Sequence, residues 1–206
     1  FYASGTKGQE LSSEPKDAGN YIVKISATVD NNLGTETTEK QVTIKKATLT
    51  ATVENKSLTY GESFETIKDN AISYSGFVNQ ETASVISGTP KYSSDYTTFG
   101  AVGEYTIDAD MNNVVAANYG FKVVSGSLDV NPREVTLTWN NYQNRTYEDG
   151  ESVTATISNL VNEDKVTVVV SGGDETEVGI HTATATGLMG EKAANYTLGT
   201  GTTQNY

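Results

Sequence analysis

The chain has 206 residues, of which 36% are hydrophobic, with 19 Gly, 3 Pro and no Cys, and its formal net charge is −12. Without cysteine it has neither a disulfide framework nor a thiolate zinc site, and its acidic charge disfavours nucleic acid and anionic membrane surfaces as partners. The 12 Tyr, 5 Phe and 1 Trp lie in patterned segments, which excludes a disordered chain, and the longest apolar run, 166–170, is strand-sized, so no membrane insertion is expected.

Alternating polarity predicts strands along most of the chain. In 47–53 and in 135–139, apolar residues alternate with threonine, as in a sheet with one face in solvent. Further strands are predicted at 71–77, 84–93, 103–111, 119–124 and 127–131. Gly126 is predicted to close a tight hairpin over 125–127. The segment 79–86 is either a short helix capped by Asn79 or a strand, and its β-branched counterpart at 162–170 favours a strand, or at most a single helical turn.

Short segments recur in the same order along the chain. Ala-Ala-Asn-Tyr occurs at 116–119 and at 193–196, and "VGEYTIDAD" at 102–110 matches "VGIHTATAT" at 178–186. A third copy of that strand opening, "AGNYIVKIS", stands at 18–26. The spacing predicts a repeat of about 80 residues, sampled three times. The predicted domains are 1–46, the C-terminal part of a first β repeat; 47–132, a complete second repeat; and 133–206, a third repeat without its last strand residues.

About seven short strands in each 80 residues, with no long helical period, predict an all-β chain of tandem small antiparallel β-sandwich modules, immunoglobulin-like in type. A β-grasp-like module with one short helix is the alternative. The junctions "KK" and "NPR" are too short and too poor in glycine to let modules reorient freely. Neighbouring repeats of the same chain are therefore the first expected partners, stacked as a semi-rigid array.

Several recurring residues are expected to serve packing and not reactivity. An aromatic residue follows Gly-X in each copy, and each Ala-Ala-Asn-Tyr supplies an Asn that tolerates turn geometry and a Tyr whose ring is buried while its hydroxyl binds a loop, as in a tyrosine corner. These structural repeat positions are Tyr21, Tyr105, His181, Asn118, Tyr119, Asn195 and Tyr196.

Chemistry-bearing residues do not assemble into a catalytic or metal-binding motif. His181, the only histidine, stands where the other copies have Tyr, and no nucleophile elbow accompanies it. Asp108 and Asp110 imitate the start of a calcium loop, but Asn113 and Tyr119 stand where the loop needs Gly and a bidentate Glu. No catalytic residue, metal or cofactor is predicted, and the chain is not expected to be an enzyme.

The best candidates for ligand contact are aromatic residues in "KYSSDYTTFG", because exposed rings on a loop stack on sugars. They are Tyr92, Tyr96 and Phe99. The third copy lacks this enrichment, so a binding role would be specific to the second repeat.

Four segments, "TYGES" at 59–63, "SGFVNQETASVISGTPKYS" at 75–93, "VGEYTI" at 102–107 and "AANYGFKVVSGSLDV" at 116–130, resemble the MBG-type repeats (mostly β, Gly-containing) of bacterial cell-surface proteins and adhesins. The third copy looks like a sister variety. The resemblance implies non-catalytic stalk or spacer repeats that present a distal binding region, in an extracellular, secreted or wall-anchored protein. The alternative is a β-sandwich module that itself binds a host glycan or an extracellular-matrix protein.

Overall fold

The computed structural model describes residues 2–3, 11–28, 35–69, 71–141, 143, 146–148 and 150–206. These residues form strands and three short 3-10 turns and contain no α-helix, which confirms the all-β class. The chain divides into two compact units. The first comprises Phe1–Glu54, Asn70–Ser93 and Asp108–Ser125, and the second comprises Asn55–Asp69, Ser94–Ile107 and Gly126–Tyr206. Each unit thus combines parts of two neighbouring sequence repeats, whose own boundaries stay a prediction.

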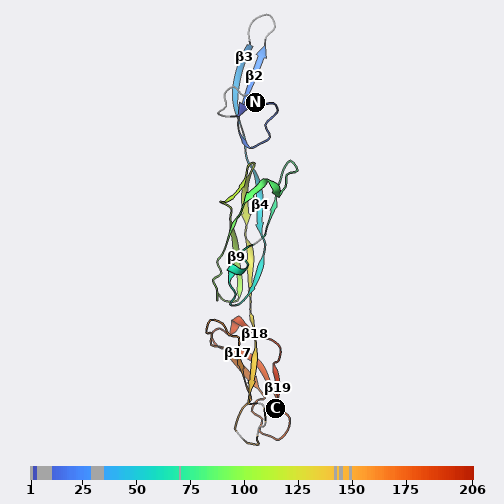
Figure 1. Ribbon diagram of the computed structural model, residues 1–206, viewed down its shortest axis with the longest axis vertical. Helices are drawn as coiled ribbons and strands as arrows, with labels where there is room; N and C mark the ends of the chain where they lie inside the picture. The colour runs from blue at the N-terminus through green and yellow to red at the C-terminus, as the bar shows by residue number, and fades with distance from the viewer. Residues whose placement is uncertain are drawn as a thin grey trace. The chain divides into compact units, whose positions relative to one another are not determined.

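The first unit contains three small sheets. In the first of them β2 (Gly19–Thr28) lies between β1 (Tyr2–Ala3) and β3 (Thr35–Ile44), all antiparallel, and Figure 1 shows β2 and β3 as a long two-stranded ribbon. In the second, β4 (Ala47–Val53) lies between β6 (Ile72–Ser75), which is antiparallel to it, and β11 (Tyr119–Val124), which is parallel. In the third, β7 (Ile86–Gly88) follows the 3-10 turn η2 (Ala83–Val85) and pairs with β10 (Val114–Ala116).

The second unit contains most of a four-stranded sheet in the order β5 (Lys56–Thr59), β12 (Gly126–Asn131), β9 (Gly103–Asp110) and β8 (Lys91–Ser94). Its β5–β12 pair is parallel and its β12–β9 pair is antiparallel. The remaining elements are β13 (Arg133–Val135), parallel to β18 (Tyr196–Leu198); β14 (Leu137–Asn140), antiparallel to β15 (Thr154–Ile157); and β17 (Thr182–Met189), between β16 (Thr167–Ser171) and β19 (Thr203–Asn205). The 3-10 turns are η1 (Phe64–Thr66) and η3 (Ala193–Asn195).

The alternation read from the sequence sets which side chains are buried. In β4 Leu49, Ala51 and Val53 are buried, while Thr48 and Thr52 are exposed, as predicted for 47–53. Leu49 forms a buried cluster with Ala116 and Tyr119, against which partly buried apolar residues pack. The core of the second unit is built in the same way from alternate strand residues such as Ile107, Leu128 and Ala183, and Tyr60 and Val153, which lie outside the strands, complete it.

The predicted hairpin over 125–127 is wrong. Strand β11 pairs in parallel with β4, and β12 pairs in parallel with β5 and antiparallel with β9, so β11 and β12 belong to different sheets. Because both segments run parallel to strands that also follow one another directly in the chain, the backbone continues past Ser125 without reversing. The sheets that contain β11 and β12 are consequently mixed, a feature that strand periodicity does not specify.

The helix capped by Asn79 is also not formed. Asn79 and Gln80 have φ values of 54° and 61°, in the left-handed region that right-handed helices do not use. A single 3-10 turn follows at η2, where the Thr82 side chain accepts the N–H of Ser84. Strand β7 begins only at Ile86, the last residue of the segment, so the strand reading of 79–86 is wrong for its other residues. The 3-10 turn is the single helical turn that the third copy allowed.

Candidate functional site

The aromatic residue after Gly-X closes the same bend in all three sequence copies. Its polar side-chain atom, a phenol hydroxyl or an imidazole nitrogen, bonds the main-chain oxygen of the residue four positions earlier: Tyr21 Oη to Asp17 O at 2.9 Å, Tyr105 Oη to Ala101 O at 2.7 Å and His181 Nε2 to Glu177 O at 2.8 Å. A carbonyl oxygen accepts hydrogen bonds, so the imidazole of His181 donates here as the phenols do. Nε2 of His181 is therefore committed to a structural contact.

Replacing His181 with Tyr is expected to leave the free energy of unfolding within about 0.5 kcal/mol of the wild type, because the phenol makes this contact in the other two copies. Replacing it with Ala removes the hydrogen bond and ring packing on Tyr206, whose centroid lies 5.7 Å away, and is expected to cost about 1 kcal/mol. Urea titration followed by the fluorescence of Trp139, the single tryptophan, measures both. A tyrosine variant less stable than the alanine variant would contradict this role.

Two β-turns of identical geometry stand at equivalent positions of the second and third repeats, over 78–81 and 161–164. The two central residues of each have positive φ, with values of 54°, 61°, 52° and 55° for Asn79, Gln80, Asn162 and Glu163. In each turn the fourth N–H donates to the first carbonyl oxygen at 3.0 Å. Both are type I′ turns, which place the first and the fourth residue side by side.

The tyrosine of each Ala-Ala-Asn-Tyr binds one of these turns through its hydroxyl. Tyr119 Oη accepts the N–H of Val78 at 3.1 Å and contacts the Glu81 carboxylate. Tyr196 Oη accepts the N–H of Val161 at 3.1 Å and donates to Asp164 Oδ2 at 2.8 Å. The repeated tetrapeptide therefore fixes a turn about 35 to 41 residues earlier in the chain.

The asparagine of the same tetrapeptide reaches back to the preceding sequence repeat. Asn118 Oδ1 accepts the N–H of Ala18 at 2.9 Å, and its Nδ2 donates to Asp17 Oδ1 at 2.8 Å. Asn195 Oδ1 accepts the N–H of Val102 at 3.0 Å. Ala18 and Val102 are equivalent, since each stands directly before a Gly-X-Tyr. One amide side chain thus joins neighbouring repeats in the same way inside each compact unit.

Replacing Asn195 with Ala is expected to lower the free energy of unfolding by about 1 kcal/mol, because Asn195 is 5% exposed and the Val102 N–H loses its acceptor. Chemical denaturation followed by Trp139 fluorescence measures the change. Asn205→Ala is the control for loss of an exposed amide, one that accepts the Thr182 hydroxyl at 2.9 Å. A stability equal to that of the control would show that the Asn195 contact does not hold the repeats together.

The second unit contains a buried carboxylate that two phenols share. Asp164 is 8% exposed, and its Oδ2 accepts the hydroxyls of Tyr60 and Tyr196, each at 2.8 Å. The two rings meet edge to face with centroids 5.4 Å apart, and Arg133 Nε donates to Tyr60 O at 2.8 Å. Tyr60 and Tyr196 belong to different sequence repeats, so this cluster is a second element of the joint between them.

The electrostatics of the cluster keep both phenols neutral. Burial raises the pKa of Tyr60 to about 12, with further contributions from the hydrogen bond to Asp164 and from its negative charge. Burial likewise raises the pKa of Tyr196, and Asp164 adds to the effect. A catalytic tyrosine that acts as a base or nucleophile needs a lowered pKa, so the arrangement supports packing and not reactivity.

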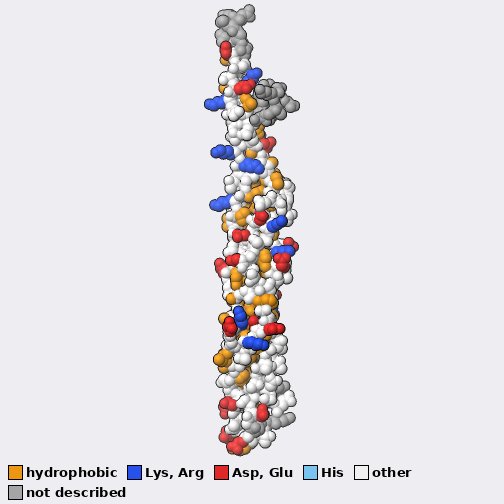
Figure 2. Space-filling model, turned by 90° about the vertical axis from the view of Figure 1, so that its left-hand side faces the viewer, with side chains coloured by type: hydrophobic (Ala, Val, Ile, Leu, Met, Phe, Trp, Pro, Cys, Tyr) orange, Lys and Arg blue, Asp and Glu red, His pale blue; other side chains and the backbone are white. Residues whose placement is uncertain are grey.

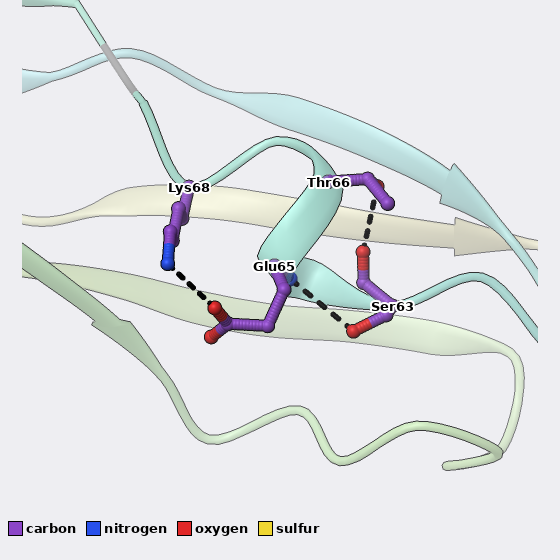
Figure 3. Close-up of polar contacts among 4 residues, drawn as sticks. All are labelled: Ser63, Glu65, Thr66 and Lys68. Atoms are coloured by element: carbon purple, nitrogen blue, oxygen red, sulfur yellow. Dashed lines mark hydrogen bonds and ion pairs between the residues drawn. The ribbon is translucent and has the colours of Figure 1, made fainter.

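The loop that carries Tyr60 is held by its own side chains. Gly61 has φ of 92°, which suits the third position of the turn 59–62, and Glu62 Oε2 accepts the N–H of Thr59 at 2.7 Å. Figure 3 shows the continuation, where Ser63 Oγ accepts the N–H of Glu65 at 3.3 Å and caps η1, and Lys68 pairs with Glu65 at 2.7 Å. The "TYGES" motif is thus a turn followed by a capped 3-10 turn, which presents Tyr60 to Asp164.

The three aromatic residues predicted for ligand contact differ in exposure. Tyr96 is 5% exposed, packs edge-on against Tyr105 with centroids 5.1 Å apart and donates to Glu62 O at 3.0 Å. Tyr92 is half-buried on β8, and Phe99 is 37% exposed with φ of 68°. Within the trio, Phe99 is the ring most available at the surface, and contact with a ligand stays a prediction.

The acidic residues considered for calcium are exposed on β9. Asp110 Oδ1 accepts the N–H of Asn112 at 2.8 Å, and Asp108 contacts the hydroxyl of Ser125. Among the described residues, no group of three or more His, Asp or Glu is close enough to hold a metal ion.

On the face seen in Figure 2, acidic and basic side chains are interspersed. No helix within the described part of the chain is long and apolar enough to cross a membrane.

Sequence reasoning did not assign the turn carboxylates, Glu81 and Asp164, or the partner tyrosine, Tyr60. Their signal was present in the matching segments "GFVNQE" at 76–81 and "NLVNED" at 159–164, each of which ends in an acid. Both repeats have an acidic residue at the end of this turn and a Tyr that is expected to be buried. Together they indicate a hydrogen bond between the carboxylate and the tyrosine hydroxyl.

The chain was compared with family models, curated proteins and solved structures. No curated protein and no solved structure matches the chain significantly. Residues 49–129, the segment that contains Tyr60-Gly61 and the first Ala-Ala-Asn-Tyr, match the family model of the MBG domain (YGX type), which confirms the MBG-type resemblance of this part of the chain.

Proposed function

We propose that this chain is a non-catalytic stalk segment of a bacterial cell-surface adhesin, whose tandem repeats hold a distal binding region away from the cell. The observation that carries the proposal is the joint: an asparagine of one repeat accepts a main-chain N–H of the preceding repeat at 2.9 Å in one unit and at 3.0 Å in the other. A spacer needs such a contact at every junction, because it limits bending between modules. The MBG match at 49–129 supports a surface-protein repeat, and an extracellular location follows from the same proposal.

Small-angle X-ray scattering on the whole chain tests the spacer role. Two whole modules and a half, placed end to end, are expected to give a maximum dimension of at least roughly 75 Å. The double variant Asn118→Ala, Asn195→Ala is expected to keep its strand content by circular dichroism but to scatter as a broader range of conformers. A compact particle, or a double variant identical to the wild type, would contradict the proposal.

Phe99 favours one second candidate, a module that binds a host glycan or an extracellular-matrix protein. Its ring is 37% exposed on an irregular segment, the kind of position where repeats acquire ligand contacts. A glycan array and a matrix-protein binding assay on the whole chain, with Phe99→Ser as the matched variant, test it. Binding that Phe99→Ser abolishes would favour this candidate over a pure spacer.

A further inference from the structure

The first and the last strands of the second repeat are hydrogen-bonded neighbours that run in the same direction. Strand β4, which opens the repeat, pairs in parallel with β11, and β5, which follows β4, pairs in parallel with β12, the last strand of the repeat. The first of these ladders aligns six residue pairs and the second aligns four. The strands that receive the chain from one neighbouring repeat are thus bonded directly to the strands that lead to the next.

Parallel pairing decides how such a ladder responds to tension. A pull from the N-terminal side reaches β4 at Ala47, which lies beside Tyr119. The chain leaves β11 at Val124, which lies beside Thr52 at the other end of the ladder. Tension along the chain therefore acts on opposite ends of the pair, so the interstrand hydrogen bonds are loaded together, in shear. An antiparallel pair pulled at two directly opposite residues instead loses its bonds one after another.

Both ladders are flanked by buried side chains of the paired strands. Leu49 of β4 and Tyr119 of β11 belong to one buried cluster. In the second ladder Leu58 and Val130 stand opposite one another and are 4% and 3% exposed. A hydrogen bond is stronger where water does not compete for its groups, so these surroundings raise the resistance of each ladder to separation.

Few residues separate the ladders from the strands of the neighbouring repeats. Strand β3 ends at Ile44 and β4 begins at Ala47. At the other end β12 ends at Asn131 and β13 begins at Arg133. Strand β13 is itself parallel to β18, with Arg133 aligned with Tyr196, so the third repeat also opens with a parallel ladder. Tension that leaves β12 therefore enters another pair of the same kind with little slack.

We propose that the second repeat is a load-bearing module, in which the parallel ladders β4–β11 and β5–β12 form a mechanical clamp against tension along the chain. The proposal deepens the stalk role and rests on it for the direction of the force, because a stalk between a cell and its target is pulled at both ends. The clamp keeps the repeat folded under a force that would peel an antiparallel pair apart, and it thereby keeps the length of the stalk constant.

Atomic force spectroscopy on the whole chain tests the clamp, because handles can be attached at chosen cysteines in a chain that has none of its own. Handles at Lys45→Cys and Pro132→Cys pull along both ladders. Handles at Glu104→Cys and Asp129→Cys separate two residues that stand directly opposite in the antiparallel β9–β12 pair. All four positions are exposed.

Forced unfolding is governed by the unfolding rate, so at one pulling speed the force along the ladders is expected to be about threefold higher than the force across β9–β12. Unfolding between the handles at 45 and 132 should lengthen the chain by roughly 250 Å, which identifies the second repeat. Equal forces in the two directions, or a lower force along the ladders, overturn the clamp. A chain that scatters as an extended particle yet gives equal forces would keep the stalk role and lose only the clamp.

Removing one bond of the first ladder tests which contacts resist the force. The N–H of Ala47 donates to Asn118 O at 2.9 Å, and the alternation of a parallel ladder then directs the N–H of Lys122 to β4. Lys122→Pro removes this donor, and Lys122→Ala, which keeps it, is the matched control. The proline variant is expected to lower the force along the ladders by about one third relative to the control and to leave the force across β9–β12 unchanged. An unchanged force along the ladders overturns the proposal, and the comparison of the two pulling directions does not depend on this variant.

Discussion

Replacing Asp164 with Ala is expected to lower the free energy of unfolding of the second unit by about 3 kcal/mol. The carboxylate is 8% exposed and accepts two phenol hydroxyls, so its removal leaves Tyr60 and Tyr196 with buried donors that lack this acceptor. Each such donor costs about 1 to 3 kcal/mol. Urea denaturation followed by the fluorescence of Trp139, which lies in the same unit on β14, measures the loss.

Two further variants separate the hydrogen bonds from general effects of charge. Glu191→Ala removes an exposed carboxylate from the same unit and should change stability by less than about 0.5 kcal/mol. The double variant Tyr60→Phe, Tyr196→Phe removes both donors, so adding Asp164→Ala to it should cost less than Asp164→Ala does in the wild type. If the two costs are equal, the hydroxyls are not the partners that make Asp164 important.

Raising the pH from 10 to 12 is expected to lower the free energy of unfolding by up to about 2 kcal/mol through Tyr60 alone. The pKa of Tyr60 is raised from 10.0 to about 12 in the folded protein, mainly by burial. The unfolded chain therefore releases this proton first, so the stability contribution is complete below pH 10 and is lost as the pH rises towards 12. Urea midpoints at pH 9, 10, 11 and 12 give the pH dependence.

The variant Tyr60→Phe is the matched control for this pH dependence. It keeps the buried ring but has no proton to release, so its urea midpoint should fall less steeply between pH 10 and 12. The remaining slope is expected from other tyrosines whose pKa burial raises, among them Tyr196 and Tyr119. Absorbance of tyrosinate at each pH reports the titration directly. A slope identical to that of the wild type would contradict the raised pKa of Tyr60.

The predicted effects of Asp164→Ala and of high pH both concern the cluster that joins the second and third repeats. Tyr60 belongs to the second sequence repeat, whereas Asp164 and Tyr196 belong to the third, and all three lie in one compact unit. A change at any of them is therefore expected to alter the coupling between repeats as well as the stability of either. This distinguishes the cluster from an ordinary core position such as Val153, which is buried within the third repeat.

The sequence by itself determined the local structure and the repeated positions. Strict alternation of apolar residues and Thr placed β4 at 47–53 with the bounds that the structure has. Alternation is sufficient for this because a strand buries every second side chain. The strand predicted at 119–124 likewise has the bounds of β11. The recurrence of Asn and Tyr in Ala-Ala-Asn-Tyr, without any reactive neighbour, predicts a structural role for both residues.

The tertiary structure alone decided which distant groups those residues meet. Asn195 bonds a main-chain N–H 93 positions away, and Tyr60 bonds a carboxylate 104 positions away. The parallel pairing of β4 with β11, and of β5 with β12, likewise depends on chain direction, which side-chain alternation does not encode. A periodic pattern predicts which side of a strand is buried. It does not predict the burial of Asp164, which depends on contacts from two repeats, because the carboxylate of an isolated turn would remain in water.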